Sequence, residues 1–402
     1  MTERLYYTDP YATEFDAQVL QIVAFEDQGR KAAVLDRTAF YPTSGGQPFD
    51  TGVLGTVRVS DVIDNDDGTI LHVIEGDLAL GPVHARIDWE RRFDHMQQHT
   101  GQHVLSAAFE HLTGARTVSF RLGASSSTID LAREVSSADI DRAESEANRV
   151  VWEDRPVEIR FVDAAETARL PLRKEPVREG LLRLISVENF DLSACGGTHV
   201  ARTGAIGIIA VGSSERFRGG TRIEFMCGGR ALGHHRMLRD SVAASTRLVS
   251  VLPTELPAGI ERLQNEGRHL KRRVKELQAR LATHEAATLA EAAEHHGAVR
   301  AVVAALDDWD ANGLKIIATA IAERAGYAAV VLSTPPPSAL VIARAADLRV
   351  DSATILKQML EQFGGKGGGR PELAQGGGLE GSTDDMIAFA RSALAAATAS
   401  TA

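Results

Sequence analysis

Three histidines recur at a spacing of four residues in the segment HMQQHTGQH, at positions 95, 99 and 103. On an α-helix, residues four apart lie on one face, so any two of these imidazoles can bind one metal ion. A second segment, CGGTH at 195–199, offers a thiol and an imidazole at the same separation. These residue types suit the binding of a transition metal through nitrogen and sulfur.

The direction of the histidine face decides between a core role and a ligand role. We expect the helix to begin at Asp94, a residue type that caps helix N-termini. With about 100° per residue, the face of His95, His99 and His103 points away from the apolar residues that follow, which are Val104, Leu105, Ala108, Phe109 and Leu112. Two interpretations remain, surface histidines or ligands that face another part of the chain. Helix geometry does not decide which two of the three would bind.

The pairing of the two motifs favours the ligand interpretation. A His-x₃-His pair alone is a weak signal, but together with a Cys-x₃-His pair it is typical of a zinc site with nitrogen and sulfur donors. Cys195 and Cys227 are the two cysteines in the chain. We expect Cys227 to be a small buried residue.

Length and composition limit the class of protein. At 402 residues the chain is long enough for two or three domains. It contains no run of about 18 apolar residues, which a membrane-spanning helix needs, and its polar N-terminus does not resemble a signal peptide. With two cysteines we expect no disulfide framework and a cytoplasmic location. The net charge of −10 argues against a general nucleic-acid coat but allows a local basic face.

The pattern of apolar residues predicts an α+β protein of several domains. Short runs of Val, Ile and Leu between turn-forming residues predict a small β-barrel or sandwich over 1–92, of which we take the barrel. Alternating helical and strand-like segments over 93–240 predict an α+β domain that carries the histidines. A β-α-β-β-α order over 293–402 predicts an α/β domain.

Between these domains, residues 253–292 carry apolar residues that step by four and three, with Gly267 at one of these positions. The spacing predicts a helical coiled coil of about three heptads or a short antiparallel hairpin arm. Between Glu261 and Arg280 there are seven Lys or Arg residues and three Glu residues. They form either a solvated helix face or an arm that contacts phosphates.

The segment GGKGGGRPELAQGGG at 364–378 is rich in glycine. Nine glycines between Gly364 and Gly381 argue against a packed strand or helix, and they predict a flexible linker or a phosphate-binding loop with Lys366 and Arg370. The linker is the poorer interpretation because a further helix follows. The segment is not a Walker loop, because no Ser or Thr follows Lys366.

Several of these motifs resemble one family. HTGQHVLSAAF, followed by CGGTH, is similar to the metal-binding pair in the editing domains of alanyl-tRNA synthetases and the free-standing AlaX proteins. FYPTSGGQPFDTG at 40–52 resembles the family's glycine-rich segment, GTRIEF at 220–225 resembles one of its strands, and 364–378 resembles the loop of its C-terminal DHHA-type domain. Arg121 departs from the pattern, where a histidine would be expected.

The resemblance implies a long-form editing protein that hydrolyses serine or glycine esters of tRNA for alanine. It selects His99, His103, Cys195 and His199 as zinc ligands and leaves His95 as a surface or supporting residue. It implies catalytic roles for Thr43 and Gln47 around the glycine turn. Substrate or tRNA contacts are expected at Gly45, Gly46, Arg222, Lys366 and Arg370. A homodimer through the arm or the C-terminal domain is a further expectation.

Two other functions remain open. A tRNA-binding protein without catalytic activity would use the zinc structurally, and four protein ligands are typical of a structural site. An editing factor for threonine-type tRNA is the other alternative, but the C-terminal glycine-rich module favours the alanine family. An ordinary β-turn remains the alternative to a catalytic role for Thr43 and Gln47.

Overall fold

The computed structural model describes residues 1–24, 30–167, 169–173 and 181–399. The chain divides into two compact units, Met1–Ala244 and Ser245–Ala402. None of the helices in these described ranges has the length and apolar character needed to cross a lipid bilayer. The division of the sequence into four segments stays a prediction.

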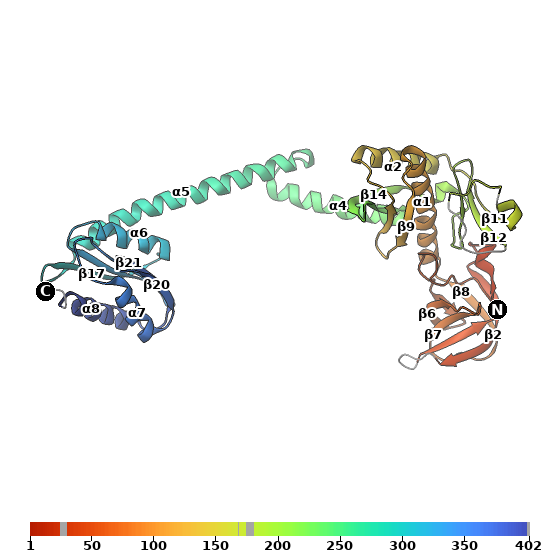
Figure 1. Ribbon diagram of the computed structural model, residues 1–402. Helices are drawn as coiled ribbons and strands as arrows, with labels where there is room; N and C mark the ends of the chain where they lie inside the picture. The colour runs from red at the N-terminus through yellow and green to blue at the C-terminus, as the bar shows by residue number, and fades with distance from the viewer. Residues whose placement is uncertain (25–29, 168, 174–180, 400–402) are drawn as a thin grey trace. The chain divides into compact units, whose positions relative to one another are not determined.

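The first unit begins with a closed barrel of six strands in the order β2-β3-β7-β6-β5-β8, which confirms the predicted barrel (Figure 1). Its strands are β2 (Glu14–Ala24), β3 (Lys31–Leu35), β5 (Gly52–Leu54), β6 (Val57–Asp64), β7 (Ile70–Glu75) and β8 (Gly81–Ile87). Two short strands, β1 (Glu3–Arg4) and β4 (Arg37–Thr38), pair beside it. Alternate residues of β2, such as Phe15 and Ala17, enter the core, as the period of a strand requires.

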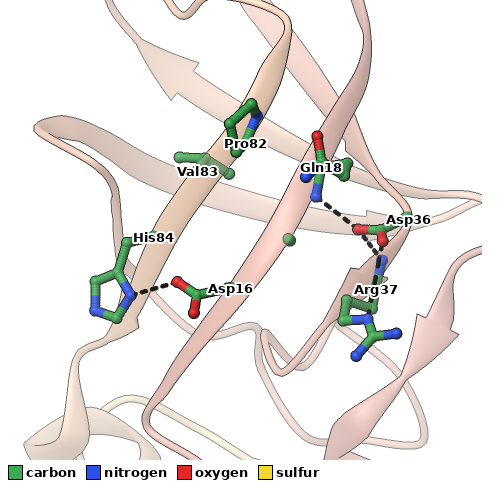
Figure 2. A pocket seen from close by; sticks show the side chains of 8 residues that line it. Asp16, Gln18, Asp36, Arg37, Pro82, Val83 and His84 are labelled. Atoms are coloured by element: carbon green, nitrogen blue, oxygen red, sulfur yellow. Dashed lines mark hydrogen bonds and ion pairs between the residues drawn. The ribbon is translucent and has the colours of Figure 1, made fainter.

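A pocket on the barrel wall involves strands β2 and β8 (Figure 2). Asp16 lies opposite His84 in the strand register, and its carboxylate is 2.9 Å from His84 Nδ1. Asp36 accepts hydrogen bonds from the backbone N–H groups of Gln18 and Arg37. These contacts hold strand edges together, and the residues that line the pocket include none of the predicted site residues.

The histidine segment lies in helix α1 (Trp89–Thr113), which follows the barrel directly. The predicted start at Asp94 is wrong, because Asp88 is the N-cap and its carboxylate accepts from the Arg91 N–H. Asp94 lies inside the helix and pairs with Arg230 at 2.6 Å. The first turn carries Trp89 and Phe93, which pack against the core of this unit, and polar contacts also hold it to the barrel.

The main polar contact of this turn is a buried ion pair between Arg92 and Asp50. Both side chains are fully buried, and Arg92 Nη2 lies 2.5 Å from Asp50 Oδ2. Arg92 also donates to the carbonyl oxygens of Pro10 and Ala39, and Asp50 accepts from the Tyr41 N–H. With its hydrogen bonds satisfied, the pair joins α1 to the segment that contains the glycine turn. Removing one partner of such a pair typically costs about 3–5 kcal/mol.

The rest of the first unit packs around α1. A four-stranded sheet has the order β14-β15-β10-β9, and a three-stranded sheet has the order β11-β12-β13. Their bounds are β9 (Thr117–Leu122), β10 (Ser127–Leu131), β14 (Ile209–Phe217), β15 (Gly220–Cys227), β11 (Val157–Val162), β12 (Leu182–Val187) and β13 (Asp191–Ala194). The helices are α2 (Ser137–Trp152), α3 (Ala164–Thr167) and α4 (Gly228–Val249), the last of which crosses the unit boundary. Apolar residues of α1, α2, β10 and β15 form one core.

The second unit is a six-stranded sheet covered on both faces by helices (Figure 1). Its order is β16-β17-β18-β19-β21-β20. The elements are α5 (Leu256–Glu291), β16 (Glu294–His296), β17 (Val299–Asp307), α6 (Ala311–Ala322), β18 (Tyr327–Thr334), β19 (Ser338–Arg344), α7 (Ser352–Phe363), β20 (Lys366–Arg370), β21 (Leu373–Leu379) and α8 (Thr383–Ala399). One core holds α5 and α6, and the other holds α7 and α8. Short 3-10 turns occupy Leu5–Tyr7, Thr203–Ile206 and Pro253–Glu255.

The glycine-rich segment is not the loop that we predicted. It forms a β-hairpin in which β21 pairs with both β19 and β20. A Cβ on Gly367 would lie 2.5 Å from the Gln375 carbonyl oxygen, and a Cβ on Gly369 would lie 2.3 Å from Ala374 Cα. Glycine is therefore needed here because the two strands approach too closely for side chains. Average strand propensities do not predict strands that are rich in glycine.

The predicted arm is one continuous helix, α5, of 36 residues. An antiparallel hairpin within 253–292 is therefore wrong. Pairing of this helix as a coiled coil stays a prediction.

Candidate metal centre

Four side chains from two distant segments come together in the first unit. His99 and His103 project from α1, and Cys195 and His199 belong to the loop after β13. Their candidate ligand atoms all lie within 4.8 Å of one another. Cys195 Sγ is 3.4 Å from His99 Nε2 and 3.4 Å from His199 Nε2. Tetrahedral ligands bound at about 2.0–2.3 Å lie roughly 3.3–3.8 Å apart, so these two sulfur–nitrogen separations suit a metal ion.

The three imidazoles are oriented by hydrogen bonds at their Nδ1 atoms. The partners are Gln47 Oε1 for His99 at 2.8 Å, Asp191 Oδ2 for His103 at 3.0 Å, and Thr100 Oγ1 for His199 at 3.2 Å. The oxygens of Gln47 and Asp191 are acceptors, so they require a proton on Nδ1 of His99 and His103 and leave the Nε2 lone pairs for a metal. The Thr100 hydroxyl can donate or accept, so its bond orients the His199 ring without fixing its tautomer.

Gln47 contacts both ligand segments. Its side chain is fully buried, and Oε1 accepts hydrogen bonds from His99 Nδ1 at 2.8 Å and from the Thr198 N–H at 3.0 Å. Its Nε2 donates to Thr198 Oγ1 at 2.8 Å. One amide therefore joins the helix ligands to the CGGTH loop. With these contacts, both ends of the amide are already engaged by the protein.

The glycine turn brings Gln47 into this position. Gly45 and Gly46 have φ values of +55° and +85°, which suit a two-residue hairpin turn and favour glycine. Hydrogen bonds between Ser44 and Gln47 close the turn at 2.9 and 3.1 Å. Thr43 is exposed, and its backbone N–H donates to the Val62 carbonyl. The turn thus exposes Thr43, Gly45 and Gly46 but buries Gln47.

Asp191 is a supporting residue that sequence reasoning missed. Its carboxylate is fully buried and accepts from His103, from Arg173 Nε at 2.5 Å and from Ser193 Oγ at 3.1 Å. Burial opposes its ionisation, but the bonds from His103 and Arg173 outweigh this and hold the pKa of Asp191 well below its usual range. One signal in the sequence could have indicated this role, namely that Asp191 lies four residues before Cys195.

The cluster also favours ionisation of its thiol. Burial would raise the pKa of Cys195, but the nearby His99 and His199 imidazoles outweigh it and keep that pKa well below the usual value. Burial, followed by the proximity of His99, lowers the pKa of His199 to about 3. Burial would lower the pKa of His103, but its bond to Asp191 raises it. A thiolate and a neutral imidazole are forms that bind metals, and binding at His103 would displace a proton.

A buried arginine braces the CGGTH loop. Arg183 Nη1 donates to the carbonyl oxygens of Cys195 at 2.7 Å and Gly197 at 2.9 Å, and its Nε donates to the Tyr7 carbonyl. These bonds fix the backbone on both sides of Gly196. The loop geometry is therefore held independently of the histidines.

The remaining predicted residues lie elsewhere. His95 is 3% exposed, so a surface position is wrong, and its role as a supporting residue stays a prediction. Arg222 pairs with Asp130 at 2.7 Å and points to the sheet face opposite that of the buried Ile223, whose face packs on α1. Lys366 and Arg370 are exposed on β20 in the second unit. Cys227 is fully buried and is not a member of the metal cluster.

Two adjacent glycines allow a matched test of this geometry. A Cβ on Gly197 would lie 2.1 Å from His99 Cε1, whereas a Cβ on Gly196 would meet its nearest atoms, in Tyr7, at 3.8 Å. We expect Gly197→Ala to displace His99 and lower metal affinity by about 10–100-fold, the range seen when ligand support is lost. Gly196→Ala should keep the metal. Elemental analysis after dialysis against graded chelator measures both, and equal metal retention would contradict the close approach of His99 to the loop.

Three family models match separate parts of the chain. They are described as tRNA synthetases class II (A) at residues 2–91, the threonyl and alanyl tRNA synthetase second additional domain at 182–224, and the DHHA1 domain at 298–396. The second match includes Cys195 and His199, and the third includes the glycine hairpin. The order of the three agrees with the order of the motifs in the chain.

Similar proteins cover nearly the whole chain. An alanine–tRNA ligase of Methanoregula boonei is 35% identical over 94% of this chain, and one of Pyrococcus furiosus is 34% identical over 93%. The chain spans only 42% of the length of each ligase. The alanyl-tRNA editing protein AlaX-L of Pyrococcus horikoshii is 32% identical, and the alignment covers 94% of both chains. The chain therefore belongs to the family of the alanyl-tRNA editing protein AlaX-L.

Proposed function

We propose that this protein is a zinc-dependent hydrolase that removes serine or glycine from mischarged tRNA for alanine, acting in trans. The observation that carries the proposal is the cluster of His99, His103, Cys195 and His199, in a chain that aligns end to end with a named alanyl-tRNA editing protein. A mixed set of three imidazoles and one thiolate suits zinc. When bound, zinc would polarise an ester carbonyl or lower the pKa of a water molecule.

The protein's own side chains orient the site. Gln47 and Asp191 hold His99 and His103 so that the Nε2 atoms face Cys195. Because the amide of Gln47 is engaged at both ends, we assign it a positioning role in place of direct contact with the substrate. Thr43, Gly45 and Gly46 are exposed next to it, and we assign them the substrate contacts. A hydroxyl that reads the serine side chain would separate seryl from alanyl esters.

Deacylation assays test the proposed reaction. We expect the protein to hydrolyse Ser-tRNA and Gly-tRNA charged on tRNA for alanine while sparing Ala-tRNA, and to lose this activity after chelation until zinc is restored. Cys195→Ala should lose both zinc and activity, whereas Cys227→Ala should keep both, because Cys227 lies outside the cluster. Zinc bound without hydrolysis would favour the tRNA-binding protein with a structural zinc. Hydrolysis only of serine attached to tRNA for threonine would favour an editing factor for threonine-type tRNA.

A second test separates positioning from catalysis at Gln47. We expect Gln47→Ala to lower zinc affinity by about 10–100-fold because His99 and Thr198 lose a shared partner. Saturating zinc should then restore most of the deacylation rate. Thr43→Val, at an exposed position of the same turn, should leave zinc affinity unchanged. A large rate loss in Gln47→Ala at full zinc occupancy would show that Gln47 acts on the substrate directly.

The partner in this proposal is tRNA, bound in part by the second unit. Lys366 and Arg370 are exposed at the two ends of β20, and the three residues between them are glycines. Cations beside accessible peptide groups suit a phosphate backbone. We also propose that the chain associates with a second copy through α5. The residues of α5 are not those of the proposed tRNA contact on β20.

Charge reversal tests the tRNA contact. We expect Lys366→Glu and Arg370→Glu each to weaken tRNA binding and to reduce the slope of log affinity against log salt by roughly one. Deacylation at saturating tRNA should change little, because the metal cluster lies in the first unit. Lys315→Glu on α6 makes the same charge change at another exposed site of the second unit and should have a smaller effect. Equal effects of all three variants would contradict a specific contact at β20.

A further inference from the structure

The aromatic ring of Phe120 lies between the metal cluster and the glycine turn. Its centroid is 5.5 Å from that of the His99 ring, with 42° between the two planes, which is a packed arrangement for two rings. A Cβ on Gly46 would lie 2.8 Å from Phe120 Cε2 and 3.2 Å from Phe120 Cζ. One ring therefore contacts both a candidate metal ligand and the exposed turn to which we assign substrate contacts.

The position of Phe120 in the sheet explains why its ring reaches the site. β9 is the edge strand of its sheet, and Phe120 pairs there with the fully buried Ile129 of β10. Paired residues on neighbouring strands point to the same face of a sheet. Phe120 therefore lies on the face that packs on α1, where the core buries its ring only in part and the ring extends to His99.

The ring is fixed in place on several sides. The Leu122 N–H donates to the Gly46 carbonyl oxygen at 3.1 Å, which joins the end of β9 to the turn. The core of α1, β10 and β15 packs against the ring on one side, and His99 lies on another. In a close-packed environment the ring cannot move aside without displacing one of these groups. Phe120 is therefore a rigid boundary of the space between His99 and Gly46.

We infer that Phe120 limits the size of the amino acid that the site accepts. The inference rests on the proposed function, in which the ester carbonyl lies at the metal and the amino-acid side chain reaches the glycine turn. A side chain bound between His99 and Gly46 must lie against the Phe120 ring, because the ring contacts both. Phe120 is thus a specificity-determining residue that favours small esters such as those of serine and glycine.

Threonine is the most direct probe of this boundary. It carries the hydroxyl group of serine and one additional methyl group, so a site that reads only the hydroxyl accepts both amino acids. One extra group of this size in a closed pocket changes kcat/KM by about 10–200-fold. We therefore expect the wild-type protein to hydrolyse the seryl ester at least about tenfold better than the threonyl ester of the same tRNA.

Replacement of the ring tests the inference, with serine or threonine attached to tRNA for alanine as the substrates. We expect Phe120→Ala to lower the preference for serine by about tenfold or more. The seryl kcat/KM should fall by about fourfold, which corresponds to the lost apolar contact of one methylene group, and the threonyl kcat/KM should rise. Phe120→Leu keeps an apolar side chain against the core and should give an intermediate preference. Val118→Ala, at a 66% exposed position of the same strand, should keep the wild-type preference.

The rise in the threonyl kcat/KM separates this role from structural support of His99. If Phe120 only supported the His99 ring, its loss would lower the zinc content and both rates together, and saturating zinc would restore them. That result would overturn the inference, as would an unchanged preference in Phe120→Ala and Phe120→Leu at full zinc content, or equal hydrolysis of both esters by the wild-type protein. Each of these outcomes would leave the proposed deacylase unaffected. A wild-type protein that hydrolyses neither ester would overturn both proposals.

Discussion

The buried ion pair of Arg92 and Asp50 sets the relation between the barrel and helix α1. Asp50 belongs to the segment that carries the glycine turn, and Arg92 lies two helical turns before His99. While the pair is intact, Gln47 reaches His99 at hydrogen-bond distance, and through Thr198 it reaches the CGGTH loop. The metal cluster thus depends on a contact between two groups that bind no metal themselves. Because both charges are fully buried, losing either one would leave the other without compensation.

The centre combines two kinds of support with different physical roles. Helix α1 supplies a rigid spacing between His99 and His103, which follows from its hydrogen-bonded backbone. The CGGTH loop has no such regularity, and Arg183 fixes it through its carbonyl groups while Gly197 leaves room for the His99 ring. The histidines also differ in their Nδ1 partners, which are an amide, a carboxylate and a hydroxyl. The carboxylate of Asp191 raises the pKa of His103, whereas burial lowers the pKa of His199.

Much of this arrangement could be predicted from spacing, because His-x₃-His on a helix and short alternating strands are local patterns. The barrel and the β-α-β-β-α order of the second unit follow from such patterns. The contacts of Gln47 and Asp191 could not, since their partners lie 52 and 88 residues away along the chain. The predicted start of α1 at Asp94 is also wrong, since Asp88 is the cap and Asp50, the partner of Arg92, lies 42 residues away along the chain. The glycine hairpin could not be predicted because glycine has a low strand propensity. Here its missing side chain permits close strand pairing.

The separation of the ligands along the chain has a consequence for synthesis. The barrel strands and α1 are complete by Thr113, but Cys195 and His199 emerge from the ribosome only after more than eighty further residues. During that interval His99 and His103 lack their thiolate, Gln47 lacks Thr198, and α1 lacks the part of its core that β15 supplies. The barrel has its own apolar core, which includes neither Cys195 nor His199. A metal ion that needs all four of these side chains could therefore be bound only after residue 199 has been made.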